Sequence, residues 1–444
     1  MELLVYLVHV SVALALIITS IAYTHRLTHP YTLFCVLVVV LLMSDFAIRG
    51  YSAETTDDVS TEYLYELQLL IIGLCTTICV VAFALNRSGR ASPPSAPILL
   101  PHRFAKVAAS IAWSIVLLEV IKRLYFSDWS MTMALMYSIG PRGSAPWLPR
   151  AGELGNLGDE KIFLAPTIIL MPLAGMLFGY LAVLSEKRRA LSLAGLLITL
   201  AILVVDGGRT PVVAVLGATA LVVLIHKRPS LRTYIGLALV ALLIAASTSV
   251  MFHFRSEGLV QLAEETAPEF ELTYHQDDNY RQTLLSLERS LTTSERWDPW
   301  TFAYVVAVNP IPRALWPTKP ALLADYWGNY KNEWTTITFI GELAAMFGFF
   351  GGLIASVIIA ICVFQMISRA YRLVDEYGGV IVYLLIALYG YMVLRSLLNI
   401  AQFIYLPAAS LLIYGVLKLV LSGARSGNRR APTNADDIAS PRRQ

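Results

Sequence analysis

Four prolines flank two basic residues in segment 310–320, Pro-Ile-Pro-Arg-Ala-Leu-Trp-Pro-Thr-Lys-Pro. Proline fixes φ and removes a backbone donor, so this segment is predicted to be stiff and non-helical, with Arg313 and Lys319 held at a set distance from the membrane surface. A guanidinium offers phosphate oxygens a planar fork of donors and an ammonium adds a point charge, so together they could neutralise a pyrophosphate. The alternative is a proline-rich loop whose basic residues contact lipid head groups.

A second candidate phosphate site is segment 206–211, Asp-Gly-Gly-Arg-Thr-Pro. Its two glycines allow the backbone to reverse tightly, and Pro211 suits the first turn of a following helix. The amides exposed in such a turn form a weakly positive concavity for an anion, with Arg209 at the membrane boundary beside Gly208. An ordinary helical hairpin, whose arginine extends to the surface, is the alternative.

Further charged residues lie in or beside apolar runs, where they are costly and tend to face a cavity or a partner. Glu342 begins such a run, so its carboxyl group is either a first-turn residue favoured by the helix dipole or a base that faces a cavity. Arg395 comes near the end of the next run. Two pairs have the spacing of ion pairs within one helix: Asp45 with Arg49, and Glu119 with Arg123.

The elements that must hold these residues are membrane helices. The 444 residues are 57% hydrophobic and only 15% charged, with a mean hydropathy of +0.63, which excludes a water-soluble globular protein. Apolar runs near the ~20-residue length of a bilayer span predict an all-α polytopic membrane protein in which residues 1–421 form one domain. Eleven spans are expected, at 3–22, 31–48, 67–85, 104–125, 162–184, 190–205, 211–225, 233–252, 343–367, 379–399 and 403–421.

Basic residues predict the orientation of these spans, because cytoplasmic loops carry an excess of lysine and arginine. Loops on one side hold 19 basic and 5 acidic residues, and those on the other hold 14 basic and 22 acidic residues. The basic side is expected to be the cytoplasm, so the N-terminus lies outside and the C-terminus inside. Segment 422–444 is predicted to be a disordered cytoplasmic tail, and loops 122–161 and 255–335 are expected outside.

The long outer loop 255–335 is the expected place of function, because it is rich in aromatic and apolar residues. Leu284, Leu287 and Leu291 recur at helical spacing and predict an amphipathic helix, either packed on the bundle or lying in the interface. A short apolar stretch at 300–308 follows. The loop also holds five tryptophans, Trp316 among them, which could stack on sugar rings or form an aromatic belt at the interface.

Several other chemistries lack a sequence signal. The four cysteines all lie in apolar runs and are expected to be free packing residues: Cys35, Cys75, Cys79 and Cys362. No zinc-ligand spacing, Walker loop or hydrolase nucleophile motif occurs, so no metal and no cofactor are expected. The net charge of +3, without a basic block interleaved with aromatics, gives no indication of a nucleic-acid partner.

The motifs together resemble one family, the Wzy-type O-antigen, or oligosaccharide repeat-unit, polymerases of bacterial envelopes. Segment 311–320 resembles the Pro-Arg-x-x-Trp-Pro-x-Lys-Pro stretch of their large periplasmic loop. Downstream, Thr338, Gly341-Glu342, Phe347-Gly348 and Gly351 are similar to the family's Thr, Gly-Glu, Phe-Gly and Gly pattern, and Gly208-Arg209 is similar to its Gly-Arg turn. The motif resemblance covers 206–211 and 309–352, and elsewhere the chain agrees in topology and hydropathy.

The resemblance implies a bundle similar to the GT-C glycosyltransferases, in the bacterial inner membrane, with its active site and N-terminus on the periplasmic side. It implies metal-independent polymerisation of undecaprenyl-pyrophosphate-linked oligosaccharides into O-antigen, capsule or exopolysaccharide, with the lipid bilayer and a chain-length regulator protein as further partners. Arg209 and Arg313 would stabilise the pyrophosphate leaving group, and Glu342 would act as a base. The resemblance adds four expected substrate contacts: Lys319, Arg395, Trp316 and Gly208.

Two other functions remain open. An O-antigen ligase of the same superfamily would transfer a finished glycan and would be expected to use a histidine of the large outer loop, for which His275 is available. A lipid-linked oligosaccharide transporter or polysaccharide exporter would show repeated halves and charges deep in several helices. The sequence has no evident internal repeat, and its charges cluster toward the outer ends of the predicted spans.

Overall fold

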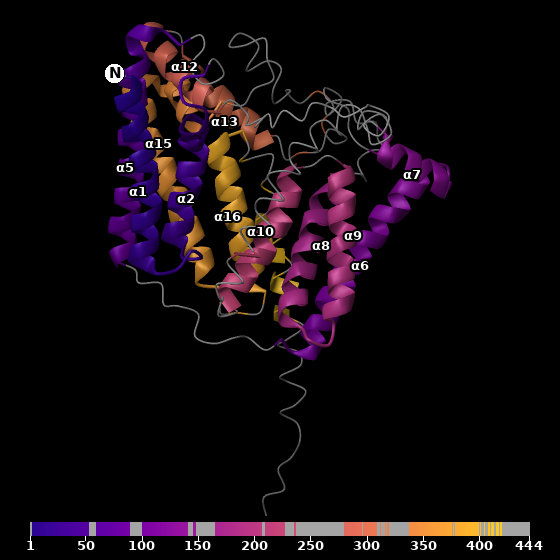
Figure 1. Ribbon diagram of the computed structural model, residues 1–444. Coiled ribbons are helices and arrows are strands. Elements are labelled where there is room, and N and C mark those ends of the chain that lie inside the picture. The colour runs from indigo at the N-terminus through magenta and orange to yellow at the C-terminus, as the bar shows by residue number, and fades with distance from the viewer. Residues whose placement is uncertain are drawn as a thin grey trace, which may run out of the picture.

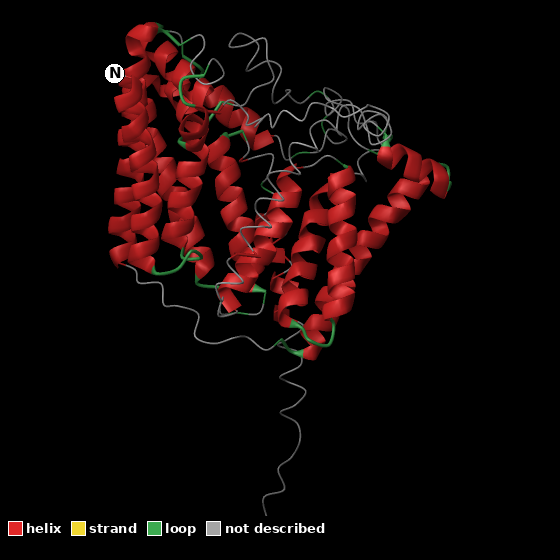
Figure 2. Cartoon of the chain, in the orientation of Figure 1, coloured by secondary structure: helices red, strands yellow, loops and turns green. Residues whose placement is uncertain are grey.

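The regular structure of the chain is helical throughout the residues that the structure describes (Figure 2), which confirms the predicted all-α class. The computed structural model describes these residues: 2–52, 59–88, 100–140, 145–147, 165–206, 209–226, 235–236, 279–294, 296–308, 311, 316, 318, 337–374, 376, 378–398, 400, 404 and, within 407–419, all but 409, 413 and 417. The predicted span 233–252 and the tail 422–444 lie almost wholly outside them.

Among the described residues, four helices are long and apolar enough to cross a membrane: α1 (Glu2–Thr24), α5 (Thr61–Ser88), α6 (His102–Tyr125) and α15 (Phe339–Tyr371). Shorter apolar helices accompany them: α2 (Pro30–Leu42), α8 (Ala165–Leu184), α9 (Arg189–Val205), α10 (Arg209–His226) and α16 (Gly379–Arg395). A membrane protein is therefore supported by helix length and composition. The total of eleven spans and the GT-C-like arrangement stay predictions.

The structure differs from the predicted spans at two helix boundaries and shows a further helix in one predicted loop. The segment predicted as one span at 31–48 forms two helices, because the backbone at Met43 leaves helical geometry and α3 (Ser44–Arg49) starts after it. The loop predicted at 122–161 contains a further helix, α7 (Met131–Ile139), whose first turn is capped by the Ser130 hydroxyl. The ninth predicted span begins at Phe339, four residues earlier than expected, because the first turn of the helix includes the charged Glu342, at which the apolar run was ended.

The helices form two packed groups that meet at α16 (Figure 1). One group contains α1, α2, α5, α15 and a further helix, α12 (Asn279–Thr292). In the other, α8 contacts α6, α9 and α10. Gly175 and Gly179 of α8 face α10 with small-xxx-small spacing, and a Cβ at Gly175 would lie 2.7 Å from Val215 Cγ2. Close approach of these two helices therefore requires glycine.

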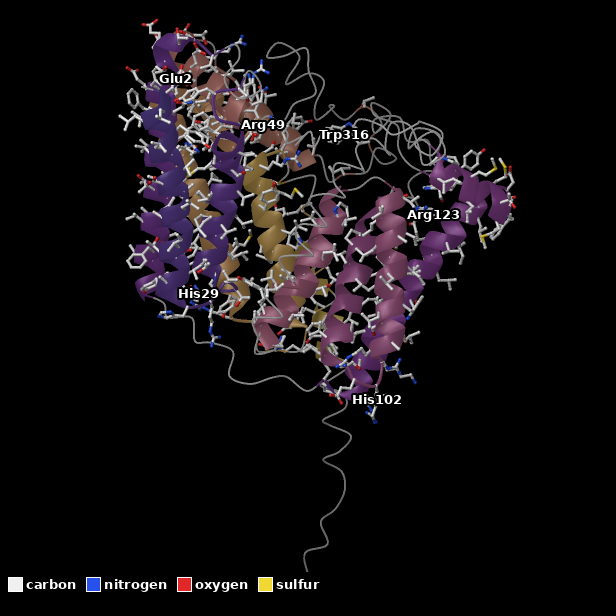
Figure 3. The ribbon with its side chains drawn as sticks, in the orientation of Figure 1. Glu2, His29, Arg49, His102, Arg123 and Trp316 are labelled. Carbon is white, nitrogen blue, oxygen red and sulfur yellow. The ribbon has the colours of Figure 1, made fainter. Side chains whose placement is uncertain are left out.

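The two ends of the bundle carry different segments. Figure 3 places Glu2, Arg49, Trp316 and Arg123 at one end, which we call the Trp316 end, and His29 and His102 at the other, the His102 end. The long helices run between these two ends, and from α1, α2, α5, α6, α8 and α9 to α10, and again from α15 to α16, their direction alternates (Figure 1). As far as the structure describes them, segments that are predicted to lie on the same side of a membrane therefore lie at the same end of the bundle.

The Trp316 end is covered by α12 and by α13 (Pro299–Val308). The predicted amphipathic helix is confirmed as α12, and it packs on the bundle, since Tyr280, Leu284 and Leu287 are fully buried against it. The apolar stretch predicted at 300–308 is α13. Its first turn is capped by Asp298, and hydrogen bonds from the Thr301 hydroxyl and nearby backbone N–H groups lower the pKa of that carboxyl.

A break at Gly348 divides α15 into two parts. The residue has φ 75° and ψ 174°, a conformation that is essentially restricted to glycine. Three residues earlier, the Ala345 carbonyl accepts a hydrogen bond from the backbone N–H of Trp297 (3.0 Å). The break thus lets the segment that leads into α13 bind directly to the spanning helix.

Replacing Gly348 by alanine is expected to destabilise the protein by about 1–3 kcal/mol, because an L-residue is strained at this φ. The new Cβ would also lie 3.1 Å from Arg296 Nε. The measurement is thermal unfolding in detergent micelles. Gly73→Ala in α5 is the matched control, since a Cβ there meets nothing within 4 Å and stabilisation by about 0.5–1 kcal/mol is expected. Equal shifts for both variants would contradict the assigned strain.

Candidate functional site

The predicted site residues are described to different extents. The structure describes Glu342, Arg395 and Trp316 with their side chains. Arg209 is the first residue of α10, and only its backbone is described. The remaining three lie outside the described residues: Gly208, Arg313 and Lys319. The structure therefore places the helices and turns on which part of the site depends, and the pyrophosphate contacts themselves stay predictions.

Glu342 is buried in the first turn of α15 and holds the end of α16. Its Oε1 accepts a hydrogen bond from the Ser396 hydroxyl and its Oε2 accepts one from the Leu397 backbone N–H, both at 2.5 Å. Ser396 directly follows Arg395, the last residue of α16, and its backbone is extended. The carboxyl group therefore fixes the point at which the chain leaves α16 beside Arg395.

These contacts bear on the role expected of Glu342. A base must reach the hydroxyl proton that it accepts, directly or through one water. The side chain has no exposed surface, and both of its oxygens already accept hydrogen bonds within the protein. This geometry favours a positioning role for Glu342, and its role as a base stays a prediction.

The other motif residues near Glu342 allow α12 to lie against α15. The hydroxyls of Thr338 and Thr283 are 2.7 Å apart and both residues are buried. At Gly341 a Cβ would lie 2.8 Å from the Cβ of Ser286, so any larger residue would push α12 away. Thr338 and Gly341 thus have packing roles between α12 and α15 in this structure.

A buried ion-pair network lies across the bundle, at the end of α6. Arg123 Nη2 donates to both carboxylate oxygens of Asp206, at 2.7 and 2.8 Å. Its Nε donates to Glu119 (3.1 Å) and its Nη1 to the Ser138 hydroxyl on α7 (3.1 Å). The guanidinium also lies 5.1 Å from the centre of the Trp147 ring. One side chain therefore joins α6, α7 and the turn between α9 and α10.

Sequence spacing found only part of this network. The Glu119–Arg123 pair is confirmed, as is the pair of Asp45 with Arg49 at 3.5 Å. The partner Asp206, 83 residues away from Arg123, was not predicted, although it begins the Asp-Gly-Gly-Arg turn. The available sequence signal was that Arg123 and Asp206 have opposite charges and each lies at the end of an apolar run. Spacing in the sequence does not show which charged residues of different helices form a pair.

A hollow of about 230 Å³ lies beside this network, between α6, α7 and α9. Arg123 and Ser138 provide its polar edge. The rest of its lining is apolar: Val120, Leu124, Met131, Ala134, Leu135, Ala201, Ile202 and Val205. Such a surface suits hydrocarbon rather than a sugar ring.

The described residues contain no cluster of three or more histidine, cysteine, aspartate or glutamate side chains that could hold a metal ion. The four cysteines are unbridged, and of these Cys362 alone is exposed. The acidic and basic groups of the described site are instead paired with each other or with backbone and hydroxyl groups, as in the two networks above.

Comparisons with protein-family models, with curated proteins and with solved structures find no match for this chain. The resemblance to the repeat-unit polymerases therefore stays a prediction that rests on the motifs in the sequence.

Proposed function

We propose that the protein polymerises oligosaccharide repeat units carried on undecaprenyl pyrophosphate, as a Wzy-type membrane glycosyltransferase. The observation that carries the proposal is the Pro-Arg-x-x-Trp-Pro-x-Lys-Pro segment at 312–320. Its Trp316 lies at the same end of the bundle as Arg123 (Figure 3), whose partner Asp206 stands three residues before Arg209. The placement supports a shared site for the two motifs.

The segments around the proline-rich motif support the same site. The chain enters it from α13, which ends at Val308, and leaves it at Thr338, both at the Trp316 end. Arg395 ends α16 beside the buried Glu342. Basic side chains from α10, α16 and the proline-rich segment would thus surround one anionic head group.

In the proposed reaction a sugar hydroxyl of one lipid-linked unit attacks the anomeric carbon of the growing chain. A new glycosidic C–O bond forms, the bond to the pyrophosphate oxygen breaks, and the hydroxyl proton passes to a base or to water. Negative charge grows on the leaving pyrophosphate, so Arg209 and Arg313 stabilise the transition state more than the bound substrate. Fixed cations could supply this stabilisation without a metal ion.

The proposed setting is the bacterial inner membrane, with the Trp316 end and the N-terminus facing the periplasm and the C-terminus in the cytoplasm. The orientation rests on the excess of basic residues in the loops assigned to the opposite side. Both substrates would arrive by diffusion in the bilayer, which accounts for a glycosyltransferase without a nucleotide-binding motif. A chain-length regulator would be a further partner in the membrane.

The test is the banding of surface polysaccharide in a strain that lacks the gene, with and without the gene restored. The deletion strain is expected to retain lipid capped with one repeat unit and to lose the ladder of longer chains, because export and ligation still operate. Restoring the gene should restore the ladder. Loss of the single-unit form as well would favour a ligase or an exporter, and an unchanged ladder would exclude a required role in polymerisation.

A further inference from the structure

Asp206 ends α9 and stands directly before the two glycines that lead to Arg209. Its own backbone N–H donates to a carbonyl of α9, that of Ile202 (3.0 Å). Only two residues separate Asp206 from Arg209, the first residue of α10, so the position of Asp206 limits where α10 can begin. A contact that fixes Asp206 therefore also restricts the position at which α10 begins.

The ion pair of Asp206 with Arg123 provides such a contact. It has the bidentate geometry of the stronger ion pairs, and the exposed fractions of the two side chains are only 20% and 9%. Arg123 is itself held by Glu119, Ser138 and the ring of Trp147. Because these contacts hold the Arg123 side chain in place, its ion pair with Asp206 anchors the end of α9 to α6.

We propose that Arg123 and Asp206 are positioning residues that fix the end of α9, and with it the start of α10, so that the Arg209 guanidinium meets the leaving pyrophosphate. The inference rests on the proposed function of Arg209. A displacement of about 1 Å at a reacting group can lower a rate by about 10²-fold. The neighbouring Lys122 pairs with Glu119 at 2.7 Å and is not part of the proposal.

The first test measures the turn directly and needs no polymerase activity. A nitroxide label is attached in full-length protein at Arg209→Cys, with the exposed Cys362 changed to serine. The label is expected to become more mobile when Asp206→Asn or Arg123→Gln is added. Asp45→Asn is the matched control, since Asp45 pairs with Arg49 on α3 and Figure 3 shows Arg49 far from Arg123. Unchanged mobility in both test variants would overturn the anchoring role.

The second test is a double-mutant cycle on the rate of polymer formation in membrane vesicles. Asp206→Asn alone is expected to lower the rate by about 10–10²-fold. In the Arg209→Ala background the same change is expected to have no further effect, because there is no guanidinium left to position. A general loss of structure would instead multiply the two losses, and that result would overturn the proposal.

The two tests separate failure of this inference from failure of the proposed function. If Asp206→Asn frees the label and the rate is unchanged, Arg209 does not need positioning and the inference is wrong while polymerisation stands. If the unmodified protein forms no polymer in the vesicles, the proposed function fails, and positioning of a catalytic group fails with it. The label measurement then still reports whether the ion pair anchors the turn.

Discussion

Arg313→Ala and Arg209→Ala are each expected to abolish long-chain glycan and to leave surface lipid capped with a single repeat unit. Removing one fixed donor from a developing oxyanion typically lowers a rate by about 10²–10³-fold, which suffices to lose the ladder. Neither change removes an apolar side chain, so both variants should still insert in the membrane. The measurement is polysaccharide banding, with the amount of inserted protein determined by immunoblot.

Lysine variants distinguish the geometry of the site from its charge. Arg313→Lys and Arg209→Lys should retain little more activity than the alanine variants if each guanidinium forms two hydrogen bonds to phosphate oxygens, because an ammonium group is only a point charge. Arg289→Ala is the matched control, since Arg289 lies in the same predicted outer loop but on α12. A normal ladder in both alanine variants, with the control also normal, would contradict the assignment of the two arginines.

Helix positions were largely predictable because a membrane requires long apolar runs and a helix repeats every 3.6 residues. The run predicted at 104–125 is α6, and the leucine spacing from Leu284 to Leu291 identified α12. Both patterns depend on residues that are close in the sequence. The same reasoning found the pair of Glu119 with Arg123, one helical turn apart.

Contacts between distant segments were not predictable in this way. Glu342 meets Ser396 54 residues away, and no periodicity connects the end of one helix with the start of another. Of the three glycines at 348, 351 and 352, Gly348 takes the positive φ, and that choice depends on how Trp297 and Arg296 pack against α15. Sequence patterns give the elements, whereas their tertiary packing decides which residues share a site.

The two helix ends described at the site, those of α9 and α16, have a similar arrangement. Asp206 takes hydrogen bonds from Arg123 and stands just before Arg209, and Glu342 takes hydrogen bonds from the residues just after Arg395. In each case a buried or mostly buried carboxyl group fixes a helix end next to an arginine proposed to contact substrate. The acidic groups would then act through the basic ones. An amide of the same shape should partly replace Glu342, whose partners are a hydroxyl and a backbone N–H, but not Asp206, whose partner is a guanidinium.

Glu342→Ala is expected to lower both stability and polymer formation. The change leaves the Ser396 hydroxyl and the Leu397 N–H buried without their acceptor, at a cost of about 1–3 kcal/mol for each unsatisfied group. Thermal unfolding in detergent measures the first effect and polysaccharide banding the second. Ser396→Ala is the matched control, since it removes one of the two hydrogen bonds and keeps the carboxyl group, and a smaller loss is expected.

Glu342→Gln decides between positioning and base catalysis. The glutamine carbonyl can still accept from the Leu397 N–H, and its amide can donate to the Ser396 hydroxyl oxygen, so a positioning role predicts a rate within about tenfold of the unmodified protein. A glutamine cannot take up the proton of an attacking hydroxyl. If Glu342 were the base, Gln would therefore lose about 10²–10⁴-fold, the usual contribution of such a group, even where the protein stays fully folded. Because both oxygens of Glu342 are buried and already accept hydrogen bonds, we expect Glu342→Gln to keep the ladder that Glu342→Ala weakens.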